Sequence, residues 1–539
     1  MTCSNPVIYA DFPDPDIIRL DDAWYMASTT MHFMPGAVIL RSFDLANWEI
    51  VSHVFESIED YPAARLENGQ SIYGAGMWAP SLRYHRGRFH LMFTSNDLHK
   101  TFLFTSRNIK GPWRRRTMEG FYYDPGLYFE GKRVFVIHGN THIKLTELTP
   151  TLTGPLPGGI DRVIISDRED NGLGFEGSHL YKIRGKYYAF FIHWPHDGSQ
   201  RRTQVCHMAD SLEGPWEGFT VLDDDMGWQN AGVAQGGLVD TPDGRWFAML
   251  FQDRGAAGRM PVLIPVSWDG DKPVIGPVPQ RLELSSTRPD YRYKPLFADD
   301  DFTGTLISPK RRDAKPGKEK RALKNVWEWN HIPSNANWSL TRRPGSLMLK
   351  SCGIVPNITR ARNTLTQRVP GPCCEVSVTV DASEIKEGDW CGLSMFQSNY
   401  AYIGLTRRKG ILRLGMVEKE APTDGKIPPK ELPPVPHKND FTPGFERALF
   451  DSQTSEVSLM MRADFRNAID LVSFYFKLNG GWVQLGGDHQ LHFLLDHFTG
   501  CRAGLFMFST QKKGGRAWFK NFRIRALKAL DAHDDPQGA

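Results

Sequence analysis

The sequence lacks the features that mark membrane, disulfide-bonded and nucleic-acid-binding proteins. No apolar run reaches the about 18 residues that a membrane-spanning helix needs, so we expect none. The seven cysteines show neither a CxxC spacing nor a zinc pattern, which favours free thiols in a reducing compartment. Lys and Arg number 65 against 61 Asp and Glu, and this near balance argues against a nucleic-acid or membrane surface as the main partner.

Two further absences concern targeting and helices. The opening "MTCSNPVIYADF" has no basic segment followed by an apolar run, so we expect no signal peptide and a cytoplasmic location. Helical periodicity is missing from the second half of the chain. What is abundant instead is glycine (50), proline (36) and aromatic residues (12%), a mixture that suits short strands joined by tight turns.

One pattern recurs five times in the first half of the chain. Each copy has a short polar opening, an apolar strand, a tight turn and an aromatic-rich strand, which together predict a β-hairpin. The copies are "PDPDIIRLDDAWYMAST", "WAPSLRYHRGRFHLMFTS", "YDPGLYFEGKRVFVIHG", "EGSHLYKIRGKYYAFFIH" and "QGGLVDTPDGRWFAMLFQD". The openings lie about 45 to 65 residues apart, which is typical of four-stranded propeller blades. We therefore predict a five-bladed β-propeller over residues 1–297; a β-sandwich with chance hairpin similarity is the alternative.

The second half reads as a separate all-β domain. Strand-like segments such as "GSLMLK", "CEVSVTVDA", "GILRLGMVEK" and "GLFMFSTQ" predict a β-sandwich over residues 298–530. A basic stretch at 308–325 reads as a solvated loop, and the tail 531–539 as disordered.

Acidic residues stand at the openings of three repeats. The first strand of each propeller blade lines the central channel, so Asp14, Asp124 and Glu176 should converge although they are far apart in sequence. Like charges at close range raise one another's pKa, which can keep one carboxylic acid protonated while another stays ionised. Each residue alone could be a turn or surface acid, but the shared repeat position favours a catalytic set. Asp11 and Asp16 read as ordinary turn or strand residues.

Other side chains accompany these openings. Trp78 opens the second repeat at a carboxyl-equivalent position, and its indole could stack on a sugar ring or pack between blades. Phe33 lies in the loop after the first hairpin and could wall the pocket or pack in the core. His179 lies three residues after Glu176, so strand alternation turns it to the other face unless a bulge or twist intervenes. Arg259 could bind substrate hydroxyls, tune a carboxylate or lie on the surface.

These motifs resemble glycoside hydrolase family 43, in particular its two-domain β-xylosidase and α-L-arabinofuranosidase members. The resemblance rests on "NPVIYADFPDPDI", "GMWAPSLRY", "YYDPGLYF", "EGSHLYKIRGKYY" and "VAQGGLVDTPDGRWF", and in the second half on "WEWNHIPSNANWSL" and "ARNTLTQRVPGP". It covers nearly the whole chain. It implies a five-bladed propeller catalytic domain followed by a concanavalin-like sandwich, a jelly roll.

The resemblance also implies roles for the acidic residues. Asp14 would be the general base that activates water, Glu176 the general acid, and Asp124 a residue that tunes and orients the acid. The family is inverting, which fits two carboxyls held far enough apart to admit water. The positions that line the family's sugar pocket are matched by Phe33, Trp78, His179 and Arg259.

One departure concerns the central axis. Related sequences commonly carry His before "QGG", where it helps to hold a water or a calcium ion. This chain has Ala234, and Gln235 could partly substitute. We expect no required cofactor, leave calcium as an open question and assign no metal ligand.

The leading functional hypothesis is an exo-glycosidase that removes terminal β-D-xylose from xylo-oligosaccharides. Removal of α-L-arabinofuranosyl side groups, or both activities together, is the alternative enzyme reading. A catalytically silent carbohydrate-binding propeller with a lectin-like sandwich is the non-enzymatic one. The sandwich could buttress the propeller and lend a loop to its pocket, or bind polysaccharide. The expected partner is an oligosaccharide, not nucleic acid or membrane, and homo-oligomerisation is left open.

Overall fold

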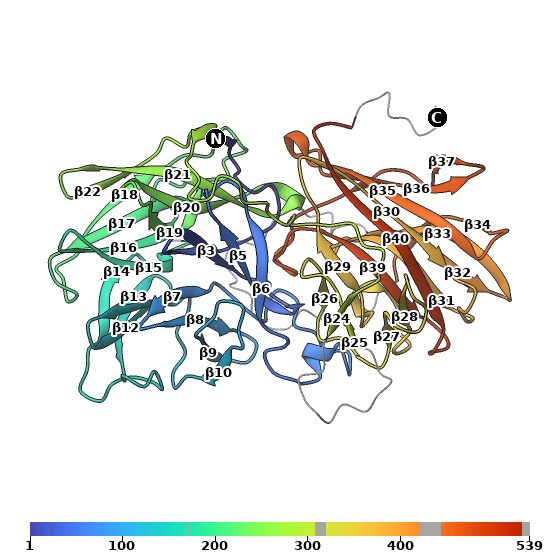
Figure 1. Ribbon diagram of the computed structural model, residues 1–539, viewed down its shortest axis with the longest axis horizontal. Coiled ribbons are helices and arrows are strands. Elements are labelled where there is room, and N and C mark those ends of the chain that lie inside the picture. Colours follow the sequence, from blue (N-terminus) through green and yellow to red (C-terminus); the bar gives the residue numbers. More distant parts are fainter. Residues whose placement is uncertain (170–171, 308–319, 420–442, 531–539) are drawn as a thin grey trace.

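A computed structural model describes residues 1–169, 172–307, 320–419 and 443–530. Two β-rich bodies lie side by side, with the N-terminal half on the left and the C-terminal half on the right of Figure 1. No helix in the described ranges is long and apolar enough to cross a membrane. The predicted all-β class, a five-bladed propeller followed by a concanavalin-like sandwich, is confirmed.

The propeller consists of five four-stranded antiparallel sheets, each built from consecutive strands. Blade one consists of β2 (Asp16–Leu20), β3 (Ala23–Ser28), β5 (Gly36–Ser42) and β6 (Glu49–Phe55). Blade two consists of β7 (Ser81–His85), β8 (Arg88–Ser95), β9 (Lys100–Ser106) and β10 (Arg114–Thr117). Blade three consists of β11 (Gly126–Glu130), β12 (Arg133–His138), β13 (His142–Leu148) and β14 (Asp161–Ser166). Blade four consists of β15 (Glu176–Ile183), β16 (Lys186–His193), β17 (Thr203–Ala209) and β18 (Glu217–Leu222). Blade five is β19 (Ala234–Asp240), β20 (Trp246–Asp253), β21 (Arg259–Asp269) and β22 (Lys272–Ile275). The five predicted hairpins are the first two strands of each blade.

Local sequence explains these hairpins. The turns between the first two strands use residues with positive φ, as at Arg86–Gly87 and Arg184–Gly185, where both residues are left-handed. Such turns match the right-handed twist of paired strands. The strands that follow are apolar on both faces, because each blade is sandwiched between two others.

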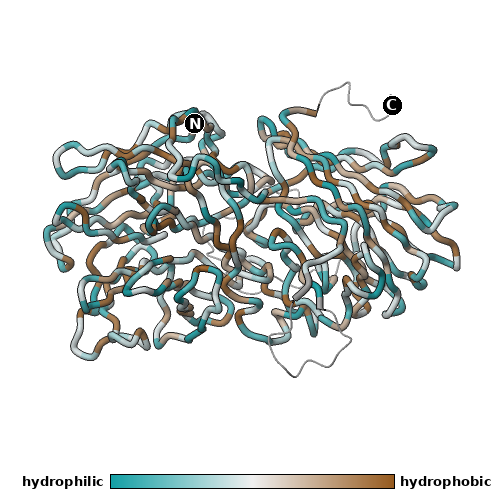
Figure 2. Tube along the Cα trace, in the orientation of Figure 1, coloured by the Kyte–Doolittle hydropathy of each residue, from teal (hydrophilic) through white to brown (hydrophobic). Residues whose placement is uncertain are grey.

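Every pair of neighbouring blades shares a buried hydrophobic cluster. The clusters contain residues of both neighbours, such as Ile39 with Leu82, Met92 with Val136, Ile137 with Leu180, Phe190 with Leu250, and Ile17 with Val239. Figure 2 shows hydrophobic stretches along the strands of both bodies and hydrophilic residues at many outer turns. Burial between blades thus holds the five inner strands around one axis.

The C-terminal body is a sandwich of two large antiparallel sheets. The first has the spatial order β34 (Phe445–Asp451), β33 (Ile411–Glu418), β32 (Ala401–Arg408), β31 (Asp389–Phe396), β39 (Arg502–Ser509), β29 (Leu365–Arg368), β26 (Glu328–Asn330), β4 (Phe33–Met34). The second has the order β27 (Trp338–Ser339), β28 (Leu347–Lys350), β40 (Arg516–Leu527), β30 (Cys373–Asp381), β35 (Glu456–Asp464), β36 (Leu471–Leu478), β37 (Gly481–Gln484), and β38 (His489–Gln490) also pairs with β36.

Short elements complete the chain. They are the strand pairs β1 (Thr2–Ser4) with β23 (Arg281–Glu283) and β24 (Thr305–Ile307) with β25 (Lys320–Ala322), and the 3₁₀ turns η1 (Ala63–Arg65), η2 (Gly255–Ala257), η3 (Ile358–Arg360) and η4 (Arg466–Ala468). The prediction of a loop over 308–325 is therefore wrong at residues 320–322, which form a strand, while 308–319 lie outside the described residues. The tail predicted at 531–539 also lies outside them.

The two bodies share a sheet. Strand β4 belongs to the propeller segment of the chain, yet it pairs with β26 as the edge of the first sandwich sheet, with Met34 opposite Trp329 and Phe33 opposite Asn330. Phe33 was expected in a loop; it lies instead in this strand, 1% exposed.

Candidate active site

The inner strands begin with an unusual backbone. In four blades, the residue three positions before the first large apolar residue of the inner strand has a positive φ. These residues are Asp14 (51°), Asp124 (44°), Gly177 (67°) and Gln235 (60°). A non-glycine residue there costs roughly 1–3 kcal/mol, and such strain gathers at functional sites. The position aims Asp14 and Asp124 from comparable points of their blades.

This register corrects the sequence alignment by one residue. Glu176 precedes the shared position, which Gly177 occupies, and Trp78 likewise precedes its blade's counterpart, Ala79. Trp78 and Glu176 are therefore equivalent to each other, not to Asp14 and Asp124. Glu176 nevertheless interacts electrostatically with both of those carboxyls, so the predicted cluster of three forms.

A bulge in β15 explains how Glu176 and His179 share one site. Glu176 pairs with Ile192 and His179 with Phe190, so three steps along β15 oppose two along β16. This is the bulge without which His179 would face the other way. His179 accordingly lies at the axis, with Nε2 3.4 Å from Asp16 Oδ1 and Nδ1 3.0 Å from the Gly177 carbonyl oxygen.

Asp14 is a buried carboxylate with a cationic partner. Arg259 Nη1 donates to its Oδ1 at 2.6 Å. Burial raises the pKa of Asp14, and the Arg259 guanidinium opposes that rise by favouring the ionised form. The Arg259 backbone N–H donates to Asp11 Oδ1 at 2.9 Å, so Asp11 anchors the arginine and is more than a turn residue.

Glu176 and Asp124 repel each other electrostatically, and no cation among the described residues contacts either of them as Arg259 contacts Asp14. Glu176 Oε2 accepts hydrogen bonds from Asn140 Nδ2 at 2.5 Å and the Tyr123 hydroxyl at 3.2 Å, and Asp124 Oδ2 accepts from the Gly177 N–H at 3.2 Å. Burial raises the pKa of Glu176, and burial together with Glu176 and Asp14 holds the pKa of Asp124 well above its usual range. The pair therefore retains a proton under conditions in which an exposed carboxyl would lose it.

An aromatic wall closes this site, and part of it comes from the sandwich. The ring of Trp78 lies 5.9 Å from Tyr123 and 5.8 Å from Phe498, centroid to centroid. The Arg259 guanidinium stacks 4.4 Å above the Phe498 ring and donates from Nη2 to its carbonyl oxygen at 3.3 Å. The sandwich thus lends a residue to this site, as the sequence suggested without locating it.

Not every expected pocket residue joins the cluster. Phe33 contacts sandwich residues: Arg502 lies 3.7 Å above its ring, and Phe396 lies 6.5 Å away. Gln235 is held by its backbone N–H, which donates to Gln204 Oε1 at 2.7 Å, and its side chain packs against Gly177. Gln235 therefore supports the β15 bulge.

Besides Phe498, sequence reasoning missed three residues of the site. Tyr123 directly precedes Asp124, so its place in the repeat could have revealed it, whereas Asn140 and Arg202 follow later strands and carried no signal. Arg202 lies in an ion pair with Asp253, and its charge opposes the rise that burial causes in the pKa of Asp14 and of Glu176.

The central axis carries a fixed cation, the guanidinium of Arg83. Asp16 Oδ2 accepts from Arg83 Nη1 and from the Leu82 N–H, each at 2.6 Å, and the Arg83 guanidinium lies 5.6 Å from the Tyr181 ring centroid. Asp16 begins β2, as predicted for a strand residue, but it is 1% exposed and pairs with Arg83, so it is not an ordinary one. Calcium takes six to eight oxygen ligands; a guanidinium already paired with the axial carboxylate, and Ala234 in β19, do not fit such a site.

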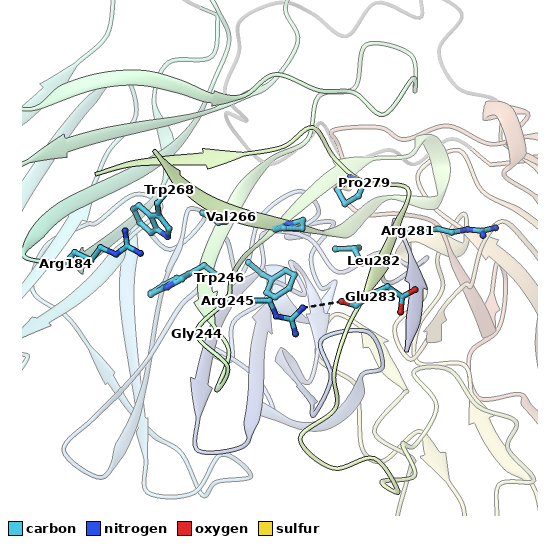
Figure 3. A pocket seen from close by; sticks show the side chains of 12 residues that line it. Arg184, Gly244, Arg245, Trp246, Val266, Trp268, Pro279, Arg281, Leu282 and Glu283 are labelled. Carbon is cyan, nitrogen blue, oxygen red and sulfur yellow. Dashed lines mark hydrogen bonds between the residues drawn. The ribbon is translucent and has the colours of Figure 1, made fainter. Parts of the chain in front are cut away.

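A separate hollow lies at the turns of blades four and five. Its volume is about 320 Å³, and its lining includes Arg184, Arg245, Trp246, Trp268 and Glu283. Figure 3 shows these side chains, with Arg245 hydrogen-bonded to the backbone of Glu283. Its only carboxylate is Glu283, so this hollow lacks the paired acids of the cluster.

Comparison with known proteins gives the same division of the chain. Residues 3–273 match the model of glycosyl hydrolases family 43, and residues 319–525 match the beta xylosidase C-terminal concanavalin A-like domain. A beta-xylosidase of Formosa agariphila is 30% identical over 75% of this chain and 74% of its own length. A non-reducing end alpha-L-arabinofuranosidase of Bacteroides ovatus is 28% identical over 78% of both chains.

Two solved structures extend the likeness to the whole fold. A bifunctional GH43-CE protein of Bacteroides eggerthii has a TM-score of 0.86 and 39% identity, covering 98% of this chain, which spans 64% of that protein. An engineered GH43 glycoside hydrolase, described as having both endo-xylanase and exo-arabinofuranosidase activity, has a TM-score of 0.83 and 27% identity, with coverage of 98% and 100%. This chain belongs to glycosyl hydrolases family 43 and is a glycoside hydrolase.

Proposed function

We propose that the enzyme is an inverting exo-glycosidase that removes terminal β-D-xylosyl residues from xylo-oligosaccharides. The observation that carries the proposal is the asymmetry of its carboxyl cluster. Burial raises the pKa of all three carboxyls, but only Asp14 touches a guanidinium, which opposes that rise and favours its ionised form. One base and one acid are therefore available at the same pH.

In the proposed mechanism Asp14 removes a proton from water as it attacks the anomeric carbon. Glu176 donates its proton to the leaving glycosidic oxygen, and Asp124 keeps that proton on the pair by repelling a second negative charge. Trp78 offers a ring face to the sugar. Trp78 Nε1 and Arg259 Nε are buried and have no hydrogen-bond partner among the described residues, and such donors suit a polyhydroxylated ligand.

Removal of α-L-arabinofuranosyl groups is the second candidate. Relatives of this chain carry both names, since a beta-xylosidase and a non-reducing end alpha-L-arabinofuranosidase match it at similar identity. Both sugars would use the same acid and base.

Two 4-nitrophenyl glycosides separate the candidates. We expect hydrolysis of the β-D-xylopyranoside with a higher kcat/KM than that of the α-L-arabinofuranoside, and xylose as the product from xylotriose. Cleavage of the arabinofuranoside alone would replace the main proposal with the second.

We also propose that hydrolysis needs no calcium and that the enzyme works in a reducing compartment such as the cytoplasm. The axial pair of Arg83 and Asp16 supports the first point, and the seven cysteines, all unpaired, support the second. Calcium added to dialysed enzyme should leave kcat unchanged; activation by calcium would contradict the first point.

A further inference from the structure

Two histidines and an aspartate meet outside the carboxyl cluster. His193 Nε2 lies 3.0 Å from Asp167 Oδ2, and His196 Nε2 lies 2.7 Å from Asp167 Oδ1. The three potential ligand atoms lie within 4.8 Å of one another. Among the described residues this is the one such group of His, Cys, Asp and Glu side chains.

The donor set is that of a zinc site. Zn²⁺ binds imidazole nitrogens at about 2.0–2.1 Å and carboxylate oxygens at about 2.0–2.2 Å, and three protein ligands with water in the fourth position are common. With such bonds, tetrahedral ligand atoms are about 3.3 Å apart, so side chains whose ligand atoms lie within 4.8 Å of one another would draw together around the ion. Oxygen-seeking Ca²⁺ and Mg²⁺ would be poor occupants of a site with two imidazoles.

The surroundings hold the ligands in place. The Asp167 side chain is 4% exposed and that of His193 10%, while that of His196 is 35% exposed. The Phe175 ring packs 4.7 Å from the His193 ring.

The trio joins two parts of the catalytic face. His193 ends β16 directly after Ile192, the partner of Glu176. The Asp167 N–H donates to the Thr141 carbonyl oxygen at 2.9 Å, and Thr141 follows Asn140, which binds Glu176. His196 lies in the loop 194–202, which ends at Arg202, whose charge acts on Asp14 and Glu176.

We propose that Asp167, His193 and His196 bind one Zn²⁺ ion that fastens the loop 194–202 to blade three beside Glu176. The ion is structural and takes no part in bond cleavage. The site is separate from the propeller axis, and the proposal does not depend on the substrate of the enzyme.

Zinc titration of the full chain tests the site. Protein dialysed against a chelator is titrated with ZnCl₂ by calorimetry, and metal content is measured after gel filtration. We expect one Zn²⁺ per chain, and at least a 10-fold weaker affinity in His196→Ala, because a three-ligand site loses one ligand. His85→Ala, which removes a histidine from blade two, is the control and should bind as the wild type does.

A second readout follows the loop itself. Arg201 and Arg202 provide trypsin sites in the loop, and Zn²⁺ should slow cleavage there several-fold in the wild type but not in His196→Ala. Since His196 is on the surface, this variant should fold even if His193→Ala does not. Absence of stoichiometric binding by the wild type, or equal affinity of His196→Ala and His85→Ala, would overturn the proposal.

Discussion

At the residue scale, two carboxyl groups of one cluster differ in their neighbours. Asp14 contacts the Arg259 guanidinium, and Glu176 contacts the neutral donors Asn140 and Tyr123. Burial raises the pKa of both, but only at Asp14 does a cation in direct contact oppose that rise. This difference is the basis on which we propose Asp14 as the base and Glu176 as the acid.

Replacement of Arg259 by glutamine should move the pH profile. Without the guanidinium, burial raises the pKa of Asp14 further, so the base becomes protonated at higher pH. The acidic limb of kcat/KM should shift upward by about 1 pH unit or more. Arg245→Gln, in an exposed turn, is the control. An unchanged acidic limb in Arg259→Gln would refute the pairing as the determinant of base ionisation.

Replacement of Glu176 by glutamine should affect substrates unequally. A leaving group that needs protonation loses its acid, whereas an activated aryl group leaves without help. We expect kcat on xylobiose to fall by about 10²–10⁴-fold and kcat on the 4-nitrophenyl glycoside to fall much less. Equal losses on the two substrates would count against Glu176 as the acid.

At the element scale, the bulge of β15 positions Glu176, the proposed acid. Gly177 has φ +67°, and a Cβ atom there would lie 2.6 Å from Gln235 Cγ. Glu176 and His179 both depend on this backbone, because the register changes between them.

Gly177→Ala should therefore lower kcat. We expect backbone strain of roughly 1–2 kcal/mol together with a displaced Glu176. Adding Gln235→Ala to Gly177→Ala should restore part of the activity, because the second substitution removes the close contact with Gln235 Cγ. The backbone strain at residue 177 stays. Gly185→Ala, which has a similar φ but open space around it, is the control for strain alone. Wild-type kcat in Gly177→Ala would contradict this account of the bulge.

The inner strands also show what sequence could and could not predict. The hairpin repeats were visible because burial between blades demands the same apolar pattern in each copy. The register of Glu176 could not be seen in the sequence, because a bulge inserts a residue without changing that apolar pattern. Asn140 and Phe498 reach the site from segments with no repeat, and β4 is two residues long. Contacts between residues far apart in the sequence therefore decide where these segments lie.

At the scale of the whole molecule, a buried ion cluster joins the two bodies. Glu328 in the sandwich accepts from Arg368 Nη1 at 2.6 Å and Arg502 Nη1 at 2.5 Å, and lies 3.0 Å from His53 Nε2 of the propeller. Arg368 Nε donates to the Asp11 carbonyl oxygen, three residues before Asp14. The sandwich therefore buttresses the segment that presents Asp14, the proposed base.

Ionised Glu328 should stabilise the folded protein at neutral pH, and this stabilisation should be lost in acid. Burial alone would raise the pKa of Glu328, but Arg368 and Arg502 hold it well below its usual range. A depressed folded-state pKa adds stability above the unfolded value of about 4.3, and that stability is lost as pH falls below it. Glu328→Gln should lower Tm at pH 7 by leaving two buried cations uncompensated, at a cost of about 3–5 kcal/mol.

The same variant should show a weaker decline of Tm between pH 5 and pH 3 than the wild type. Glu217→Gln, which removes an exposed partner of Lys272, is the control and should change Tm little. A Glu328→Gln protein as stable as the wild type at pH 7 would contradict the role of this cluster.

The central claim is that Asp14 activates water for direct displacement while Glu176 protonates the leaving group. Proton NMR of the first sugar released from a β-D-xyloside tests it most directly, before mutarotation mixes the anomers. The account predicts α-D-xylose, because one displacement inverts the anomeric carbon. Release of β-D-xylose would contradict it, since retention requires a covalent intermediate and a nucleophile in place of a base.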